Sequence, residues 1–280
     1  MTQAAPAQRA SGRETPRARG TGMRDALHAE WTKARSLAST GWLLAATIAL
    51  TVTVSAAAAA AVTCPSGHCA EDPAKISLTG IYLGQAVVAI VAVQAVSSEY
   101  STRMIRVTLV AMPRRTTVLA AKAAILTGLV LVAGTIAVLM SLLTGRLILP
   151  GNGISPVHGY PLLSLGDGPV LRAAVGSVLY LALIALLSLG AAAAVREAAM
   201  AIGIVLGLLY LFPIVGAVVS NSHLARHIQQ IGPMTAGLAI QATTGLHGLP
   251  ISPWAGLGVL AAWAAGALLA GGLLLRLRDA

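Results

Sequence analysis

Charged side chains gather in one interruption of an otherwise apolar sequence, SEYSTRMIRVTLVAMPRRTTVLAAK at residues 98–122. A charge at the centre of a bilayer costs roughly 2.5 to 3.5 kcal/mol even on a lenient insertion scale, so these groups must face water or a protein partner. The chemistry open to them there is ion pairing and charge-assisted hydrogen bonding. The charged positions before the next apolar run are Glu99, Arg103, Arg106, Arg114 and Arg115. The segment has the composition of a docking element that faces the cytosol.

The pattern within this segment predicts a short helix followed by a rigid corner. In residues 98–112 polar side chains recur every three or four positions on one face, and apolar side chains share another. Pro113 lacks a backbone N–H and disfavours helix at the preceding residue, so it ends this helix and occupies the first turn of the next. Lys122 lies one or two turns into the apolar run that follows, where a long side chain can extend its ammonium back to the inner surface.

Two pairs of residues have spacings that could support a disulfide or a metal site. Cys64 and Cys69 flank PSGH in the first loop predicted to be external, and either a disulfide or two free thiols fits the sequence. His68 lies between them without further ligands. His223 and His227 have the i,i+4 spacing that presents two ligands to a metal, but no nearby Glu or Cys completes a site. We therefore expect no metal.

Motifs of enzymes and ion-coupled transporters are missing. The sequence has no HExxH, no GxSxG and no GxxxxGK[ST], so we expect no enzyme activity, no cofactor and no ATP hydrolysis by this chain. No acidic residue lies deep in an apolar run, which disfavours a proton-coupled transporter. Gln85 and Gln94 are the main deep polar side chains, and each could line a pathway or bond a neighbouring helix. If the protein carries out energy-driven transport, another polypeptide must supply the energy.

Six apolar runs must position these residues. The chain is 56% hydrophobic and 10% charged with a mean hydropathy of +0.80, whereas a soluble domain carries about 25% charge. Each run reaches the length of about 20 residues that a helix needs to cross a bilayer. The predicted spans are 41–62, 78–96, 117–143, 170–194, 198–219 and 255–275. The predicted fold is therefore an all-α integral membrane protein with six transmembrane helices.

The basic residues predict which side each loop faces. With the N-terminus in the cytosol, only Lys75, Arg146, Arg172 and Arg226 of the 19 basic residues lie outside, as the positive-inside rule expects. Both termini are then cytosolic, and the net charge of +10 requires no nucleic acid. Residues 1–22 have the composition of a disordered basic tail, without the apolar core of a signal peptide. The recognisable pattern opens at Met23, so translation could start at Met1 or at Met23.

An amphipathic helix is predicted before the first span. Met23, Leu27, Trp31, Ala34 and Ala38 share one narrow arc, while polar residues face the other way. Such a helix would lie on the inner membrane surface, either as a lipid anchor or with its basic side toward a partner. The residues assigned to this interface helix are Leu27, Glu30, Trp31, Lys33 and Arg35.

Glycine-containing segments predict two further features. Residues 220–254 are long for a connector, and their moderately apolar middle, 231–242, is too short to cross. That middle could dip into the outer leaflet only where protein or a water-filled cavity covers it. Gly80–Gly84 and Gly203–Gly207 are GxxxG pairs, which permit close helix approach either within the chain or in a homodimer.

Three stretches resemble the ABC-2 type permeases of bacterial, in particular actinobacterial, ATP-binding-cassette exporters. They are ALHAEWTKARS at 26–36, EYSTRMIRVTLVAMPRR at 99–115 with AAK at 120–122, and LGVLAAWAAGALLAGGLLLRLRDA at 257–280. The likeness covers most of the chain from Met23, and the middle stretch is the distinctive one. It implies a permease domain over 23–280 with six spans, a membrane-surface helix, a cytosolic coupling helix and short re-entrant helices before the sixth span.

The resemblance also implies partners and site residues. The ATPase-coupling positions carried over are Glu99, Tyr100, Arg103, Arg106, Pro113 and Arg114. Arg103 departs from the family pattern, in which glycine is frequent at this position. A separate ABC subunit would bind ATP and Mg, and the chain would pair with a second permease as a homodimer or heterodimer in the bacterial cytoplasmic membrane. The expected function is export of an unidentified substrate, and lipids, hydrophobic antibiotics and peptides are all compatible with the sequence. The alternative is a membrane scaffold or sensor-associated protein that binds a cytosolic partner without transport.

Overall fold

The protein folds into a bundle of helices. The computed structural model describes residues 23–36, 38–64, 71–101, 115–154, 160 and 163–277, and over these residues it contains helices and no strand. The helices are α1 Met23–Ser36, α2 Ala38–Ala61, α3 Pro73–Ser77, α4 Ile81–Ser101, α6 Arg115–Ile148, η1 Leu149–Asn152, α7 Gly168–Val195, α8 Ala198–Val218, α9 Ser222–Ile231, α10 Pro233–Gly237, η3 Leu238–Gln241, η4 Leu246–Gly248 and α11 Pro253–Leu277.

Six of these helices, α2, α4, α6, α7, α8 and α11, are long and apolar enough to cross a membrane. This confirms the prediction of an all-α chain with six candidate spans and indicates a multi-pass membrane protein. Large apolar side chains cover the outside, as on Leu147 at 72% exposed and Leu269 at 67%. Exposed apolar surface on this scale is unusual for a soluble monomer and suits contact with lipid.

Two predicted span boundaries differ from the structure. The second run was predicted to begin at residue 78, but Leu78 to Gly80 form a turn that separates α3 from α4. α3 is capped by Asp72 and has Pro73 at its first position, so the helix restarts only at Ile81. α6 has 34 residues, about 51 Å at 1.5 Å per residue, and so exceeds the ~30 Å of bilayer hydrocarbon. It must tilt or extend beyond that layer.

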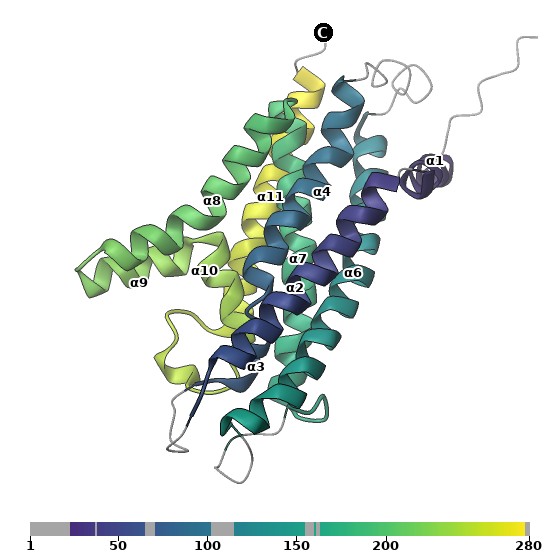
Figure 1. Ribbon diagram of the computed structural model, residues 1–280. Coiled ribbons are helices and arrows are strands. Elements are labelled where there is room, and N and C mark those ends of the chain that lie inside the picture. The colour runs from purple at the N-terminus through teal and green to yellow at the C-terminus, as the bar shows by residue number, and fades with distance from the viewer. Residues whose placement is uncertain are drawn as a thin grey trace, which may run out of the picture.

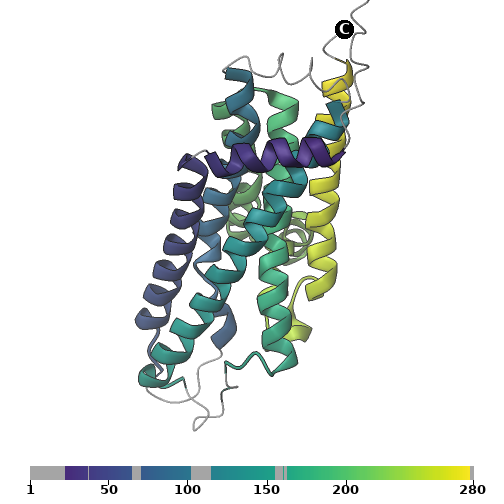
Figure 2. The same cartoon turned by 90° about the vertical axis from the view of Figure 1, so that its right-hand side faces the viewer.

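The bundle has two ends, which we name after the short helices that lie at them (Figure 1). The α1 end holds α1, the C-terminal ends of α4 and α11, and the beginnings of α6 and α8. The α3 end holds α3 and the C-terminal end of α6. Figure 2 shows α1 lying across the bundle, at a steep angle to α2 and α6.

Helices α4 and α7 form the interior. Over the apolar 18-residue stretch of each helix, 56% of the residues of α4 and 61% of those of α7 are buried, against 22% in α2, α8 and α11. The latter three helices therefore present most of their surface outward. α7 makes its most extensive contact with α11. A Cβ on Gly190 of α7 would lie 2.4 Å from the backbone carbon of Ala267, and one on Gly271 would lie 2.6 Å from the carbonyl oxygen of Gly190. Both glycines are required for this close approach.

The two GxxxG pairs lie in different environments. Gly80 and Gly84 pack against α2, where a Cβ would come within 1.9 Å and 2.2 Å of atoms of Thr51. The Gly80 N–H also donates to the Ser55 hydroxyl at 3.0 Å. Gly203 and Gly207 on α8 have open space where a Cβ would be. Packing within the chain therefore accounts for the first pair and leaves the second on the outer surface of α8.

The chain between α8 and α11 turns back toward the bundle. Figure 1 shows α8 leaning away from α11, and α9 returning toward α10. Gly232 separates α9 from α10 with extended backbone angles, and Pro233 occupies the first position of α10. α10 and η3 then pack against α7 and α11 and bury Met234 and Ile240. The moderately apolar stretch noted in the sequence is thus a pair of short helices held inside the protein.

Candidate functional site

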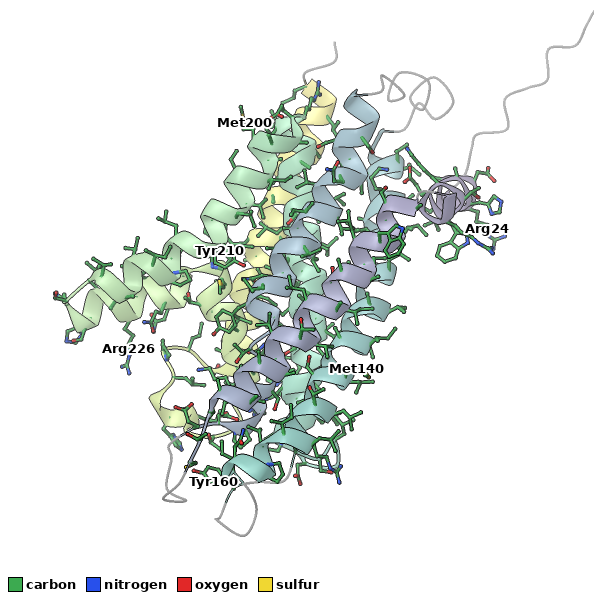
Figure 3. All side chains as sticks on the ribbon, viewed as in Figure 1. Arg24, Met140, Tyr160, Met200, Tyr210 and Arg226 are labelled. Atoms are coloured by element: carbon green, nitrogen blue, oxygen red, sulfur yellow. The ribbon has the colours of Figure 1, made fainter. Side chains whose placement is uncertain are left out.

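Helix α1 presents three faces rather than the two that its sequence pattern predicts. Ala26 is 1% exposed and packs toward the bundle together with Glu30, whereas Met23 and Trp31 are 46% and 48% exposed. Arg24 points away from the bundle on the outer side of α1 (Figure 3). Met23 and Trp31 of the apolar arc therefore lie beside the contact with the bundle, and Leu27 of the same arc is half-buried.

The contact is anchored by an ion pair between α1 and α6. The Lys122 ammonium donates to the Glu30 carboxylate at 2.7 Å, and their side chains are 7% and 13% exposed. Lys122 was predicted to extend its ammonium back to the inner surface. Instead it is buried, because α1 lies over this part of α6 and supplies a carboxylate. Burying two charges is tolerated when they pair with good geometry.

A cavity of about 250 Å³ lies beside this ion pair, between α1, α2, α4 and α6. On each spanning helix the lining changes from polar to apolar with distance from the α1 end. On α4 the lining residues run from Ser98 through Gln94 to Val91, and on α6 from Lys122 to Leu129. Gln94 lines the cavity and is exposed. The site is amphipathic along its depth.

The predicted coupling residues lie next to this cavity in the chain. Glu99 and Tyr100 belong to the last turn of α4, which also supplies Ser98 to the cavity lining. Arg103, Arg106, Pro113 and Arg114 fall outside the described residues. α6 begins at Arg115, two turns before Lys122. The ends of α4 and α6 that flank the coupling segment therefore both lie at the α1 end.

A second polar cluster lies inside the bundle around Gln85. The Tyr180 hydroxyl donates to the Gln85 side-chain oxygen, while the Gln85 amide donates to the Tyr82 carbonyl oxygen at 3.2 Å and to the Met234 sulfur at 3.1 Å. The Tyr210 hydroxyl also donates to the Tyr82 carbonyl oxygen. Gln85 and Tyr180 are fully buried. Gln85 thus joins helices, one of its two predicted roles, whereas Gln94 lines a cavity.

At the α3 end, Asp72 connects two loops that the sequence does not associate. Its carboxylate caps α3 by accepting from the backbone N–H of Ala74 at 3.1 Å. It also accepts from the Thr243 N–H at 2.5 Å, the Thr243 hydroxyl at 2.6 Å and the Thr244 N–H at 3.0 Å. Nearby, the Arg172 guanidinium donates to the Ala242 carbonyl oxygen at 2.6 Å. These bonds fix the chain between η3 and η4 against the rest of the α3 end.

We expect Asp72→Asn to destabilise the fold by at least about 2 kcal/mol, because hydrogen bonds to charged groups contribute about 1.5–3 kcal/mol each. The amide would also direct its own N–H donors at backbone N–H groups. Unfolding of the purified protein in mixed detergent measures the change. Glu71→Gln, at the exposed neighbouring position, is the control and should behave as the unmodified chain does. Equal stability of the two variants would contradict the role of Asp72.

The cysteine and histidine predictions have different outcomes. Cys64 is 2% exposed with its sulfur 3.4 Å from the Tyr160 hydroxyl, and the described residues contain no free cysteine. Cys69 lies outside the described residues, so its pairing with Cys64 stays a prediction. His223 and His227 are exposed on α9, and no cluster of three or more metal-ligating side chains occurs among the residues that the structure describes.

Comparison with models of known protein families and with curated proteins found no match to this chain.

Proposed function

We propose that the chain is the transmembrane permease subunit of an ABC exporter in a bacterial cytoplasmic membrane. In this proposal the α1 end faces the cytosol, α1 is the membrane-surface helix, and α9 with α10 forms the re-entrant segment before the last span. A separate ATPase subunit binds ATP and Mg, since the chain has no nucleotide-binding motif. A second permease, identical or related, completes the transporter.

The charged segment between the second and third spans carries the proposal. Its sequence has the distinctive likeness to ABC-2 permeases, and the helices on either side of it, α4 and α6, meet at one end of the bundle. Basic residues at that end include Lys33, Arg35, Lys122 and Arg196. This distribution supports a cytosolic assignment by the positive-inside rule. A cytosolic docking segment without its own phosphate loop calls for an energy-supplying partner.

The fold supports a route from such a partner into the spans. A partner that presses on residues 99–114 acts on the end of α4 and the beginning of α6. Because Lys122 of α6 is paired with Glu30, α1 would move with α6. Coupling of ATP binding to this movement requires contacts that differ between two states of the bundle. The charged side chains of the segment, Glu99, Arg103, Arg106 and Arg114, are the groups that we assign to those contacts.

Replacing Glu99 and Arg106 together by alanine should abolish stable association with the ATPase or uncouple ATP hydrolysis from transport. Both charged groups lie in the proposed contact with the ATPase, and truncating one partner of a buried, hydrogen-bonded charge pair lowers affinity by about 2–5 kcal/mol or more. Co-purification from the native membrane and substrate-dependent ATPase activity measure the two effects. Lys75→Ala with Arg146→Ala removes two exposed charges at the α3 end as the control.

Unchanged association and ATPase activity in the Glu99, Arg106 variant would contradict the coupling assignment. A cytosolic partner that co-purifies but neither binds nor hydrolyses ATP would instead favour a scaffold. The substrate-dependent ATPase assay therefore separates export from simple partner binding.

A further inference from the structure

We propose that a groove between α7, α8 and α11 holds one acyl chain of a membrane lipid. The groove is separate from the cavity beside α1 and includes none of the coupling residues. The inference goes beyond the export function, because the binding requires neither the ATPase nor a transported substrate. It rests on the chemistry of the lining, the position and length of the groove, and the contacts at one of its ends.

The groove forms where α8 leans away from α11, with α7 between them (Figure 1). Its volume is about 650 Å³, within the roughly 300–1,000 Å³ of small-molecule sites. Leu187 of α7 lies in its wall, together with Ile204 and Leu208 of α8. On α11 the lining residues recur every three or four positions from Val259 to Ala270. One face of α11 therefore forms a continuous wall.

The chemistry of the lining excludes a polar occupant. None of the described lining residues is charged, and Gln230 and Trp263 are the two with polar side-chain atoms. The Gln230 amide donates to the Pro250 carbonyl oxygen at 2.7 Å, and the Trp263 indole N–H donates to the Ile231 carbonyl oxygen at 3.0 Å. A polar ligand would lose its hydration here without gaining comparable partners. An alkyl chain has no such cost.

The position and length of the groove match the chain of one lipid leaflet. α8 and α11 are both candidate spans, so lipid chains surround the groove in a membrane. From Val259 to Ala270 the helix rises about 17 Å at 1.5 Å per residue, roughly half of the ~30 Å of bilayer hydrocarbon. An acyl chain lying along the spans would therefore cover the apolar walls over their whole length.

An aromatic contact bounds the groove on the side of the α3 end. Phe212 of α8 and Trp263 of α11 pack edge to face, with ring centroids 6.4 Å apart. The bond from Trp263 to Ile231 ties α9 to the same point. These contacts limit how far the walls can separate there. A single chain needs less width than a helix of a second copy, which is about 10–12 Å across with its side chains.

Tryptophan quenching by brominated lipid tests the proposal. In the full chain carrying Trp31→Phe, Trp42→Phe and Trp254→Phe, Trp263 is the remaining tryptophan. The three replaced side chains are exposed, so the fold should tolerate their loss. The purified protein in detergent is titrated with phosphatidylcholine brominated in its acyl chains. We expect quenching to saturate at one lipid per chain. Quenching that rises with lipid without saturating would overturn the proposal.

Gly266→Phe in the same background fills the groove from its own wall. Gly266 lines the groove, and its Cβ would have open space around it, so the ring can enter without displacing backbone. The affinity for the brominated lipid should fall at least about fivefold, which corresponds to the lower end of the cost of overpacking. Gly258→Phe is the matched control, since Gly258 also lies on α11 with open space but outside the lining. Equal affinities in the two variants would contradict the assignment.

Two further measurements separate the chain from other occupants. Phosphatidylglycerol with the same brominated chains should bind as phosphatidylcholine does, because the lining is uncharged; a clear headgroup preference would overturn the proposal. Native mass spectrometry counts the protein chains in each particle. A dimer that is lost in Gly266→Phe but kept in Gly258→Phe would assign the groove to a second copy instead. All of these measurements use the chain without its ATPase, so their failure leaves the proposed export function to its own test.

Discussion

Replacing Glu30 by alanine is expected to lower the stability of the protein by about 3–5 kcal/mol and to detach α1 from the bundle. The substitution removes one partner of the Glu30–Lys122 pair and leaves an ammonium that is 7% exposed without its carboxylate. Breaking a buried pair in this way costs far more than the pair contributes, because the remaining charge stays desolvated. Unfolding in mixed detergent measures the loss of stability, and limited proteolysis after Lys33 or Arg35 measures the release of α1.

The double variant Glu30→Met with Lys122→Met distinguishes pairing from general sensitivity of the site. Replacing both charges by apolar side chains of similar size is often neutral, so the double variant should recover to within about 1 kcal/mol of the original stability. Glu71→Ala, which removes an exposed carboxylate at the α3 end, is the control. If the effects of Glu30→Met and Lys122→Met simply added in the double variant, the two side chains would not be energetically coupled.

Gly190→Val should have the largest effect of any single substitution in the α7–α11 contact. The added Cβ alone would lie 2.4 Å from the Ala267 carbonyl carbon and 2.5 Å from the Leu268 nitrogen. These are backbone atoms that cannot rotate away, so the two helices must separate along their most extensive contact. We expect a loss of at least about 3 kcal/mol, the upper part of the usual range for overpacking. Detergent unfolding and the yield of monodisperse protein measure the loss.

Gly203→Val is the matched control for this prediction. Gly203 also lies inside a spanning helix, but open space surrounds the position of its Cβ. We expect a change within about 0.5 kcal/mol for the isolated chain, as for most surface substitutions. Comparable losses in the two variants would show that the cost comes from valine in these helices and not from the α7–α11 contact.

The six spans were predictable because hydrophobic length is a local property. An α-helix satisfies its own backbone hydrogen bonds, so about 20 apolar residues suffice to identify a span from sequence. The prediction failed locally at residues 78–80, where Asp72 and Pro73 start a separate short helix before α4. A hydropathy window averages over such a turn, since Leu78 is itself apolar.

The candidate site was predictable only in part, because its geometry depends on tertiary contacts. The amphipathic pattern of residues 23–36 separated polar from apolar residues, but it did not indicate which side of α1 would face α6. Glu30 and Lys122 are 92 residues apart, and each is ordinary for its own segment. The sequence left the same two roles open for Gln94 and Gln85, namely lining a pathway or bonding a neighbouring helix. Only the positions of the other helices distinguish the two glutamines: Gln94 lines the cavity between α1, α2, α4 and α6, whereas Gln85 bonds to Met234. The coupling segment remains a prediction from its sequence likeness.

The anchorage of two loops by Asp72 imposes an order on the biosynthesis of the protein. Thr243 follows Asp72 by 171 residues, so a ribosome working at about 5–20 residues per second makes the second loop about 9–34 s after the first. During that interval the carboxylate lacks its later donors and must be hydrated. The α3 end is therefore completed only after Thr243 and Thr244 have been made, and a chain that stalls after α8 would leave Asp72 without these donors.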